Sequence, residues 1–303
     1  MKPILRLIIT LFTATVMTGY ADAQQLTGTL KKIKDTGTII VGHRESSIPF
    51  SYYDDKQKAV GYSVELCLRI VDAIKTHLKM NKLDVKYNPV TSATRIPLMA
   101  NGTIDLECGS TTNNLKRQKQ VSYTITHFVT ATRFVSKKAG NLKTVSDLKG
   151  KTVVSTSGTT NIRLATKLNV EKKLGMNIIA AKDHAEAFLT VQTGRAAAFF
   201  MDDILLYSLV ATSKNPKDFV ISANSLSVEP YGIMVRKDDP AFKKVVDAAM
   251  IKIYKGGAIN AIYKKWFLKP IPPKGVNLNV PMSAQMKKVI AHPTDSGKPE
   301  DYE

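Results

Sequence analysis

Residues 94–112 read TRIPLMANGTIDLECGSTT, and residues 185–203 read AEAFLTVQTGRAAAFFMDD. The two stretches differ in sequence but share one order of predicted elements, and this shared order decides the fold. Each stretch predicts a helix that ends at a glycine, Gly102 or Gly194, followed by an apolar strand and a polar loop. We therefore expect two similar α/β lobes rather than a solenoid of many repeats.

The sequence around the first stretch alternates strand and helix patterns. In chain order, it predicts a strand at 38–42, a helix over 64–78 capped by Ser63, a strand at 83–87, a helix at 95–99 and a strand at 103–106. This βαβαβ order is typical of a mostly parallel sheet with helices on its faces.

The sequence around the second stretch repeats this plan. It predicts a strand at 152–155, a helix that follows residues 157–160 and runs through 168, a strand at 177–181, a helix at 185–191 and a strand at 196–201. Beyond them we expect the end of a strand at 235–239, helices at 240–254 and 258–267, and an extended tail over 271–303 with at most one short helix. In open α/β sheets, ligands bind beyond the carboxyl ends of the strands, so two facing lobes predict a cleft there.

The composition is that of a folded globular chain with a large positive charge. Of 303 residues, 44% are hydrophobic and 23% are charged, which excludes a disordered, collagen-like or disulfide-dense chain. Lys and Arg number 44 against 25 Asp and Glu, giving a net charge of +19. This excess favours a nucleic acid, an anionic surface or an acidic ligand as partner.

The first residues have the layout of a secretory signal peptide. A basic opening, Met1–Arg6, precedes the apolar run Leu7–Val16, and Ala21–Ala23 forms a small-x-small cleavage site. The apolar run is shorter than the about 20 residues of a membrane span. We expect cleavage of residues 1–23, with an uncleaved anchor as the alternative, and an exported, soluble protein. Export argues against a genomic nucleic-acid role.

The chain contains two cysteines, Cys67 and Cys108. An oxidising compartment permits them to pair, and both fall in the same half of the chain. We predict a disulfide, with two buried free thiols as the alternative. No partner base close in sequence marks Cys108 as a nucleophile.

The loops after the predicted strands are rich in groups that bind anions. The first half offers Ser92, Arg95, Ser110, Thr111, Thr112 and Arg117, and the second half offers Ser157, Gly158, Thr159 and Thr160. Hydroxyls and backbone N–H groups at a helix N-terminus stabilise an anion. Each residue alone is more typical of helix capping, so the prediction depends on their convergence at strand ends. The Gly158 loop lacks the Gly-Lys-Ser/Thr ending of a P-loop, which argues against a nucleotide.

Signatures of catalysis and metal binding are scarce. The chain has no His-Glu-x-x-His, no Gly-x-Ser-x-Gly and no closely spaced Cys/His cluster, and its five histidines are dispersed. We therefore expect no catalytic residues, no metal and no cofactor.

Eight segments carry a family resemblance. They are 43–52 (HRESSIPFSY), 91–98 (TSATRIPL), 107–114 (ECGSTTNN), 156–160 (TSGTT), 181–184 (AKDH), 201–203 (MDD), 265–267 (KWF) and 270–274 (PIPPK). In this order, they resemble the bacterial periplasmic glutamate/aspartate-binding proteins of ABC importers, in solute-binding protein family 3. The resemblance covers essentially the whole chain after residue 23.

The resemblance implies a fold and its boundaries. The fold would be the two-lobed type II periplasmic binding protein fold, with two crossover strands near Thr130–Arg133 and Val228–Tyr231 and a hinged cleft between the lobes. Residues 24–130 and 231–270 would form lobe I, and residues 131–230 would form lobe II.

The resemblance also implies a ligand, its contacts and its partner. Arg44, Ser92, Arg95 and His184 would hold the side-chain carboxylate; Arg117, Thr112 and Thr160 the α-carboxylate; Ser110 and Asp202 the α-ammonium. A dicarboxylic amino acid carries two anions and one cation, and arginine binds carboxylates bidentately while it stays charged. A monomer would bind L-glutamate or L-aspartate and deliver it to an inner-membrane ABC permease.

Two other classes of function stay open at this stage. A dehydratase-like enzyme on the same fold would need a carboxylate aimed at the ligand, for which Glu45 and Glu107 are the candidates. Binding to nucleic acid or to an anionic surface would need a basic patch, whereas the lysines are scattered.

Overall fold

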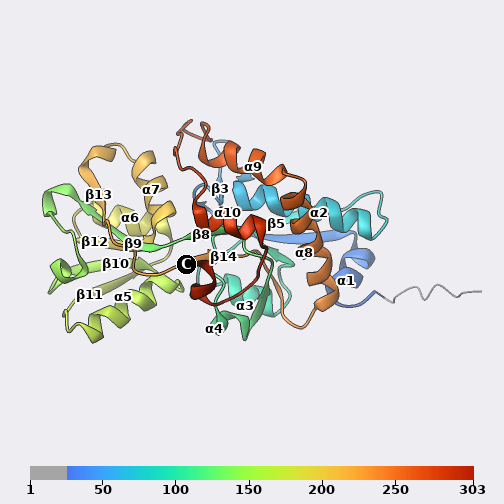
Figure 1. The fold of residues 1–303 in the computed structure, drawn as a ribbon, viewed down its shortest axis with the longest axis horizontal. Helices are drawn as coiled ribbons and strands as arrows, with labels where there is room; N and C mark the ends of the chain where they lie inside the picture. The colour runs from blue at the N-terminus through green and yellow to red at the C-terminus, as the bar shows by residue number, and fades with distance from the viewer. Residues whose placement is uncertain (1–25) are drawn as a thin grey trace, which may run out of the picture.

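Two five-stranded sheets, one in each of two lobes, organise residues 26–303, which the computed structural model describes (Figure 1). The first sheet has the order β5 (Asp84–Pro89), β1 (Thr38–His43), β6 (Leu106–Glu107), β15 (Met234–Arg236), β7 (Val121–Tyr123). The second has the order β11 (Asn177–Ala181), β10 (Thr152–Thr156), β12 (Ala198–Asp202), β9 (Thr132–Lys137), β13 (Phe219–Ile221). The signal peptide predicted at 1–23 lies outside the described residues.

The two sheets share one architecture. β1 pairs in parallel with β5 and β6, and β10 pairs in parallel with β11 and β12. In each sheet one strand runs opposite to the other four: β15 is antiparallel to β6 and β7, and β9 is antiparallel to β12 and β13. The predicted pair of α/β lobes with mostly parallel central strands is therefore confirmed.

Helices cover the sheets of both lobes (Figure 1). The first lobe has α1 (Gly28–Thr36), α2 (Tyr62–His77), α3 (Arg95–Ala100), α4 (Leu115–Gln118), α8 (Pro240–Lys255) and α9 (Ala258–Phe267), with a small sheet of β2 (Ser46–Ser47), β3 (Ser51–Tyr53) and β4 (Ala59–Val60). The second lobe has α5 (Thr160–Glu171), α6 (His184–Gln192) and α7 (Asp203–Thr212). Single 3-10 turns lie at Lys138–Gly140, Val145–Leu148, Pro216–Asp218 and Pro299–Tyr302.

Two short strands connect the lobes. β8 (Phe128–Thr130) and β14 (Glu229–Tyr231) form a separate antiparallel pair. The ring of Phe128 lies 5.0 Å from those of Phe50 and Phe267, so this pair is anchored in the aromatic core of the first lobe.

Residues 271–303 pack along the first lobe and the connecting strands. They contain α10 (Ala284–Ala291), which contacts α8 and β8. The Tyr302 side chain is buried, and its hydroxyl lies 2.7 Å from that of Thr126. Lys274 Nζ donates to the carbonyl oxygen of Thr212 at the end of α7, so this segment also contacts the second lobe.

Two local predictions were wrong. Helix α2 begins at Tyr62 after Gly61, not after a Ser63 cap. Gly61 has φ of 137°, and a Cβ there would lie 2.2 Å from the Phe50 carbonyl oxygen, so only glycine fits. Ser63 instead donates to the Gly109 carbonyl oxygen at 2.8 Å.

The second correction concerns the strand predicted at 103–106, which has only Leu106 and Glu107. The Asp105 carboxylate accepts the backbone N–H of Ile40 at 2.8 Å, so a side chain replaces a ladder hydrogen bond there.

Cys67 and Cys108 form a disulfide, with their Cα atoms 6.2 Å apart. It joins α2 to the residue that follows β6. The predicted pairing is therefore present, and the alternative of two free thiols is not found.

Removal of this disulfide should destabilise the protein, because it closes a loop with a sequence separation of 41 residues. Loop-closure entropy gives about 3–4 kcal/mol for such a loop. Urea unfolding of the wild type and of a Cys67→Ala/Cys108→Ala variant should differ by that amount under oxidising conditions, and reductant should lower the stability of the wild type only. Equal stabilities, or two titratable thiols in freshly exported protein, would contradict this.

Candidate functional site

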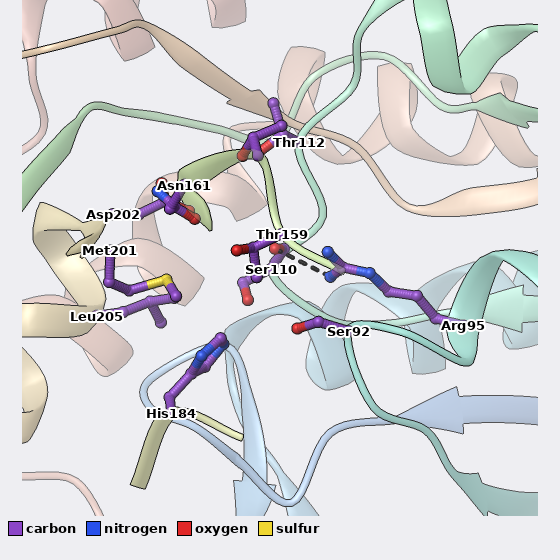
Figure 2. A pocket seen from close by; sticks show the side chains of 11 residues that line it. Ser92, Arg95, Ser110, Thr112, Thr159, Asn161, His184, Met201, Asp202 and Leu205 are labelled. Atoms are coloured by element: carbon purple, nitrogen blue, oxygen red, sulfur yellow. Dashed lines mark hydrogen bonds between the residues drawn. The ribbon is translucent and has the colours of Figure 1, made fainter. Parts of the chain in front are cut away.

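A pocket lies between the two lobes, where the carboxyl ends of their parallel strands face each other (Figure 2). The cavity left between the lining side chains is small, about 10 Å³. The first lobe contributes Ser92, Arg95, Ser110 and Thr112, and the second contributes Thr159, Thr160, Asn161, His184, Met201, Asp202 and Leu205. Seven of the nine predicted ligand-binding residues line this pocket; Arg44 and Arg117 do not.

The local structure explains why these residues meet. Arg95, Thr160 and His184 are the first residues of α3, α5 and α6, and Asp202 is the last residue of β12. Ser92, Ser110 and Thr112 stand in loops after β5 and β6. The side chains of Thr159 and Asp183 cap α5 and α6 by accepting backbone N–H groups, which fixes both helix starts at the pocket.

Arg95 is almost fully buried on the first-lobe side of the pocket, with 2% of its surface exposed. Its Nη1 lies 2.5 Å from the Thr111 hydroxyl and 3.3 Å from the Ser110 carbonyl oxygen, to both of which it donates. Burial and the nearby charge of Arg117 lower the pKa of Arg95 to about 9. The negative charge around this guanidinium is therefore too small to offset the cost of its burial.

The two arginines outside the pocket lining are also buried. Arg117 Nη1 donates to the Thr112 carbonyl oxygen at 2.8 Å, and its Nη2 reaches across to the Gly158 carbonyl oxygen at 3.2 Å. Arg44 follows β1, and burial lowers its pKa. The Arg44 side chain lies beside Gly109, which precedes Ser110 of the pocket: a Cβ at Gly109 would lie 2.9 Å from Arg44 Cγ.

Six buried polar atoms of the predicted residues have no hydrogen-bond partner within the described chain. They are Arg44 Nη1, Ser92 Oγ, Arg95 Nε, Ser110 Oγ, Arg117 Nε and His184 Nε2. In native proteins the large majority of buried side-chain polar atoms have a hydrogen-bond partner. Half of these atoms are arginine N–H donors, so the site favours an anionic ligand that accepts several hydrogen bonds.

His184 belongs to the same set but adds no charge. Burial, followed by the charges of Arg44 and Arg95, holds its pKa well below the usual 6.5. Its Nδ1 lies 2.8 Å from the Thr156 hydroxyl. When that hydroxyl donates to Nδ1, Nε2 carries the hydrogen and can donate to an anion.

The second lobe supplies a carboxylate opposite the arginines. Asp202 is 3% exposed and accepts hydrogen bonds from Asn161 Nδ2, at 2.7 Å, and from the Tyr231 hydroxyl. Burial, and then the charge of Glu229, raises its pKa to about 7. An ammonium group beside Asp202 would stabilise the ionised form. The pocket therefore has a cationic first-lobe side and an anionic second-lobe side.

The carboxylates that an enzyme would need do not reach the pocket. Glu45 is exposed, and Glu107 is buried behind Arg95 with its Oε2 bonded to the Thr111 hydroxyl at 2.6 Å. Within residues 26–303 no three His, Cys, Asp or Glu residues gather in a group that could hold a metal ion. Over the same residues no helix is long and apolar enough to cross a membrane.

Four residues that line the pocket were absent from the predicted ligand-binding set: Thr159, Asn161, Met201 and Leu205. Thr159 belongs to the 157–160 loop, whose anion-binding groups were visible in the sequence. Asn161 directly follows the predicted Thr160, so the polar run continues into the first turn of α5. Met201 and Leu205 flank Asp202 at the junction of β12 and α7 and add apolar surface.

A model of the bacterial extracellular solute-binding proteins, family 3, matches residues 39–269. The chain belongs to this family. The predicted family is therefore confirmed, and residues 270–303 extend beyond the part that the family model matches.

Named relatives agree with this assignment. The chain is 55% identical over 290 residues to the L-glutamate/L-aspartate-binding protein of Pseudomonas aeruginosa, covering 95% of this chain and 96% of the relative. It is 50% identical over 275 residues to the glutamate/aspartate import solute-binding protein of Escherichia coli, covering 90% and 91%. Both relatives are named for binding, which confirms the prediction of a binding protein rather than an enzyme.

A solved structure agrees as well. An ancestral arginine-binding protein bound to arginine superposes with a TM-score of 0.70 at 29% identity, covering 76% of this chain and 98% of that one. The predicted two-lobed periplasmic binding protein fold is thereby confirmed.

Asp202 should make the stability of the ligand-free protein depend on pH. Its pKa is about 7 in the folded chain against an ordinary value of 3.8, so between these values the folded state holds a proton that the unfolded chain releases. Stability therefore decreases as pH rises through this window. Asp202→Asn removes the effect. The unfolding free energy of the variant minus that of the wild type should therefore increase as pH rises from about 4.5 to about 7.5.

Urea unfolding at both pH values measures this difference, with exposed Asp55→Asn as the control. A difference between Asp202→Asn and the wild type that is the same at both pH values would contradict the raised pKa.

Proposed function

We propose that this chain is the solute-binding component of a bacterial ABC importer for L-glutamate and L-aspartate. After cleavage of residues 1–23, it would act in the periplasm as a monomer, bind the amino acid without chemistry, and pass it to an inner-membrane permease. The observation that carries the proposal is the convergence of buried, unpartnered arginine donors opposite a buried carboxylate. The names of the P. aeruginosa and E. coli relatives support the same ligands.

The two sides of the pocket suit the two ends of an acidic amino acid. Arg44, Ser92, Arg95 and His184 would hold the side-chain carboxylate, which glutamine and asparagine lack. Arg117, Thr112 and Thr160 would hold the α-carboxylate, while Ser110 and Asp202 would hold the α-ammonium. The Thr160 hydroxyl donates to Glu229 at 2.9 Å, so its backbone N–H at the start of α5 would make the contact with the ligand.

The proposal includes hinge closure between lobe I (24–130 and 231–270) and lobe II (131–230). A ligand that touches both lobes favours the closed state by its differential affinity. Gly158 lies where the lobes touch: a Cβ there would lie 2.6 Å from Ala93 Cα and 2.7 Å from the Ser92 carbonyl oxygen.

Isothermal titration tests the proposal directly. L-Glutamate and L-aspartate should give saturable heat, L-glutamine and L-asparagine should bind much more weakly, and the amino acids should be recovered unchanged. Binding of the amides in preference to the acids, or a chemical product, would overturn the proposal; the product would favour an enzyme. Heat with nucleic acid alone would favour the third class of function.

The arginines should separate by role. Arg117 would meet a carboxylate that every amino acid has, so Arg117→Ala should weaken all ligands together. Arg95 would meet the distal carboxylate, and loss of one partner of a buried charge pair costs about 2–5 kcal/mol. Arg95→Ala should therefore weaken glutamate strongly and glutamine little, since the neutral amide already satisfies that guanidinium poorly.

Titration of both ligands into both variants measures the ratio of glutamate affinity to glutamine affinity. Arg69→Ala, which removes an exposed arginine of α2, is the control. The ratio should collapse in Arg95→Ala and survive in Arg117→Ala. The opposite pattern would reverse the two roles.

Gly158→Ala should block closure, because the added methyl group meets the backbone of the first lobe. We expect glutamate affinity to fall at least tenfold, equivalent to about 1.4 kcal/mol. Gly150→Ala is the matched control: Gly150 lies in the same lobe with a similar positive φ, 69° against 76°, and no atom lies within 4 Å of its added Cβ.

Small-angle scattering should show ligand-induced compaction in the wild type and in Gly150→Ala but not in Gly158→Ala. Undiminished glutamate affinity in Gly158→Ala would contradict closure onto this glycine.

A further inference from the structure

Glu107 is a fully buried carboxylate at the end of β6 that the proposed ligand contacts do not use. Its side chain has 0% exposure. One oxygen, Oε2, accepts the Thr111 hydroxyl at 2.6 Å, and the other, Oε1, has no hydrogen-bond partner within the described chain. A buried carboxylate of this kind needs positive charge nearby.

Two guanidiniums supply that charge. Arg95 Nη1 lies 4.0 Å from Glu107 Oε1 and is also linked to Oε2 through the Thr111 hydroxyl. Arg44 lies on the other side of Gly109: a Cβ at Gly109 would lie 2.3 Å from Glu107 Oε1 and 2.9 Å from Arg44 Cγ. Glu107 is also the largest of the charges that raise the pKa of Arg44 against its burial.

The buried charges can be grouped by the ligand group that each would meet. Arg117 would meet the α-carboxylate and Asp202 the α-ammonium, with the buried Glu229 next to Asp202. At the distal end, Arg44 and Arg95 with Glu107 sum to one positive charge. His184 adds none, and the more distant Glu45 and Asp183 are partly or fully exposed, so solvent screens them.

We propose that Glu107 determines specificity by cancelling one of the two guanidinium charges, so that the distal end of the pocket matches a ligand group with a single negative charge. This inference rests on the proposed function. Glu107 acts through Arg44 and Arg95 rather than by touching the ligand.

Replacement of Glu107 should change ligand affinity differently if its charge matters than if it only supports the structure. Removing the negative charge leaves two positive charges facing the distal group. An anion then gains affinity relative to its neutral isostere, because the field at the distal end is stronger. A purely structural Glu107 would, when replaced, weaken glutamate and glutamine by the same factor.

Glu107→Gln tests this, since it keeps the shape of the side chain and removes its charge. The ratio of dissociation constants, glutamine over glutamate, should rise at least tenfold in Glu107→Gln. It should stay near the wild-type value in Glu107→Asp, which keeps the charge but disturbs the packing more. An unchanged or reduced ratio in Glu107→Gln, or an equal rise in both variants, would overturn the proposal.

A second measurement uses the wild-type protein and so does not depend on the folding of a variant. Two glutamate analogues carry a phosphonate or a sulfonate in place of the distal carboxylate. The phosphonate gains a second negative charge near neutral pH, as a phosphate does at about pH 6, whereas the sulfonate stays singly charged. The affinity of the phosphonate relative to the sulfonate should fall as pH rises through that step.

A relative affinity that rises with pH, or that stays constant, would overturn the inference. The titration of Asp202 affects both analogues equally, so it does not change the ratio of their affinities. Failure of the proposed function is distinguishable, because the wild type would then prefer glutamine to glutamate or yield a chemical product. Failure of this inference leaves the preference of the wild type for unchanged glutamate intact.

Discussion

The structure depends on one constraint: three arginines, Arg44, Arg95 and Arg117, are buried together in one cleft. Like charges out of water oppose one another, and burial alone already favours the neutral form of each. The chain offsets this with the carboxylate of Glu107 behind Arg95, and with backbone carbonyl oxygens that accept one N–H group each of Arg95 and Arg117. Arg44 Nη1, Arg95 Nε and Arg117 Nε have no hydrogen-bond partner within the described chain, and an anion bound between the lobes would complete the pairing.

The two lobes contribute different groups to the site. The first lobe holds the cations rigidly, because the Cys67–Cys108 disulfide and the Ser63–Gly109 hydrogen bond fix the loop after β6 to α2. The second lobe brings helix starts, a neutral histidine and a carboxylate on strand β12. Neither lobe alone offers both the cations and the carboxylate that a zwitterion with an extra carboxylate requires. The ligand itself is therefore the link that favours contact between the lobes.

The sequence predicted most of this arrangement for identifiable reasons. Strand–helix alternation is a local pattern, so hydrophobic periodicity and the glycines that end helices were enough to predict the parallel strands of both sheets. The loops at the strand ends were recognisable by their Ser, Thr and Arg residues. The prediction went wrong where a tertiary contact overrode the local signal. Ser63 looks like a helix cap but bonds Gly109, and Asp105 interrupts its strand by bonding Ile40. The place of Glu107 behind Arg95 could not be read from the chain either, because it depends on how β6 packs against α3.

The most direct test of the account is a crystal structure of the protein grown with L-glutamate. The account predicts glutamate between the lobes, its side-chain carboxylate accepting hydrogen bonds from Arg44 and Arg95 at about 2.7–2.9 Å, the usual length for such charged pairs. It also predicts the ammonium on Asp202 and Glu107 without ligand contact. A ligand bound in the reverse direction, with its α-carboxylate on Arg95 and its side chain towards Arg117, would contradict it.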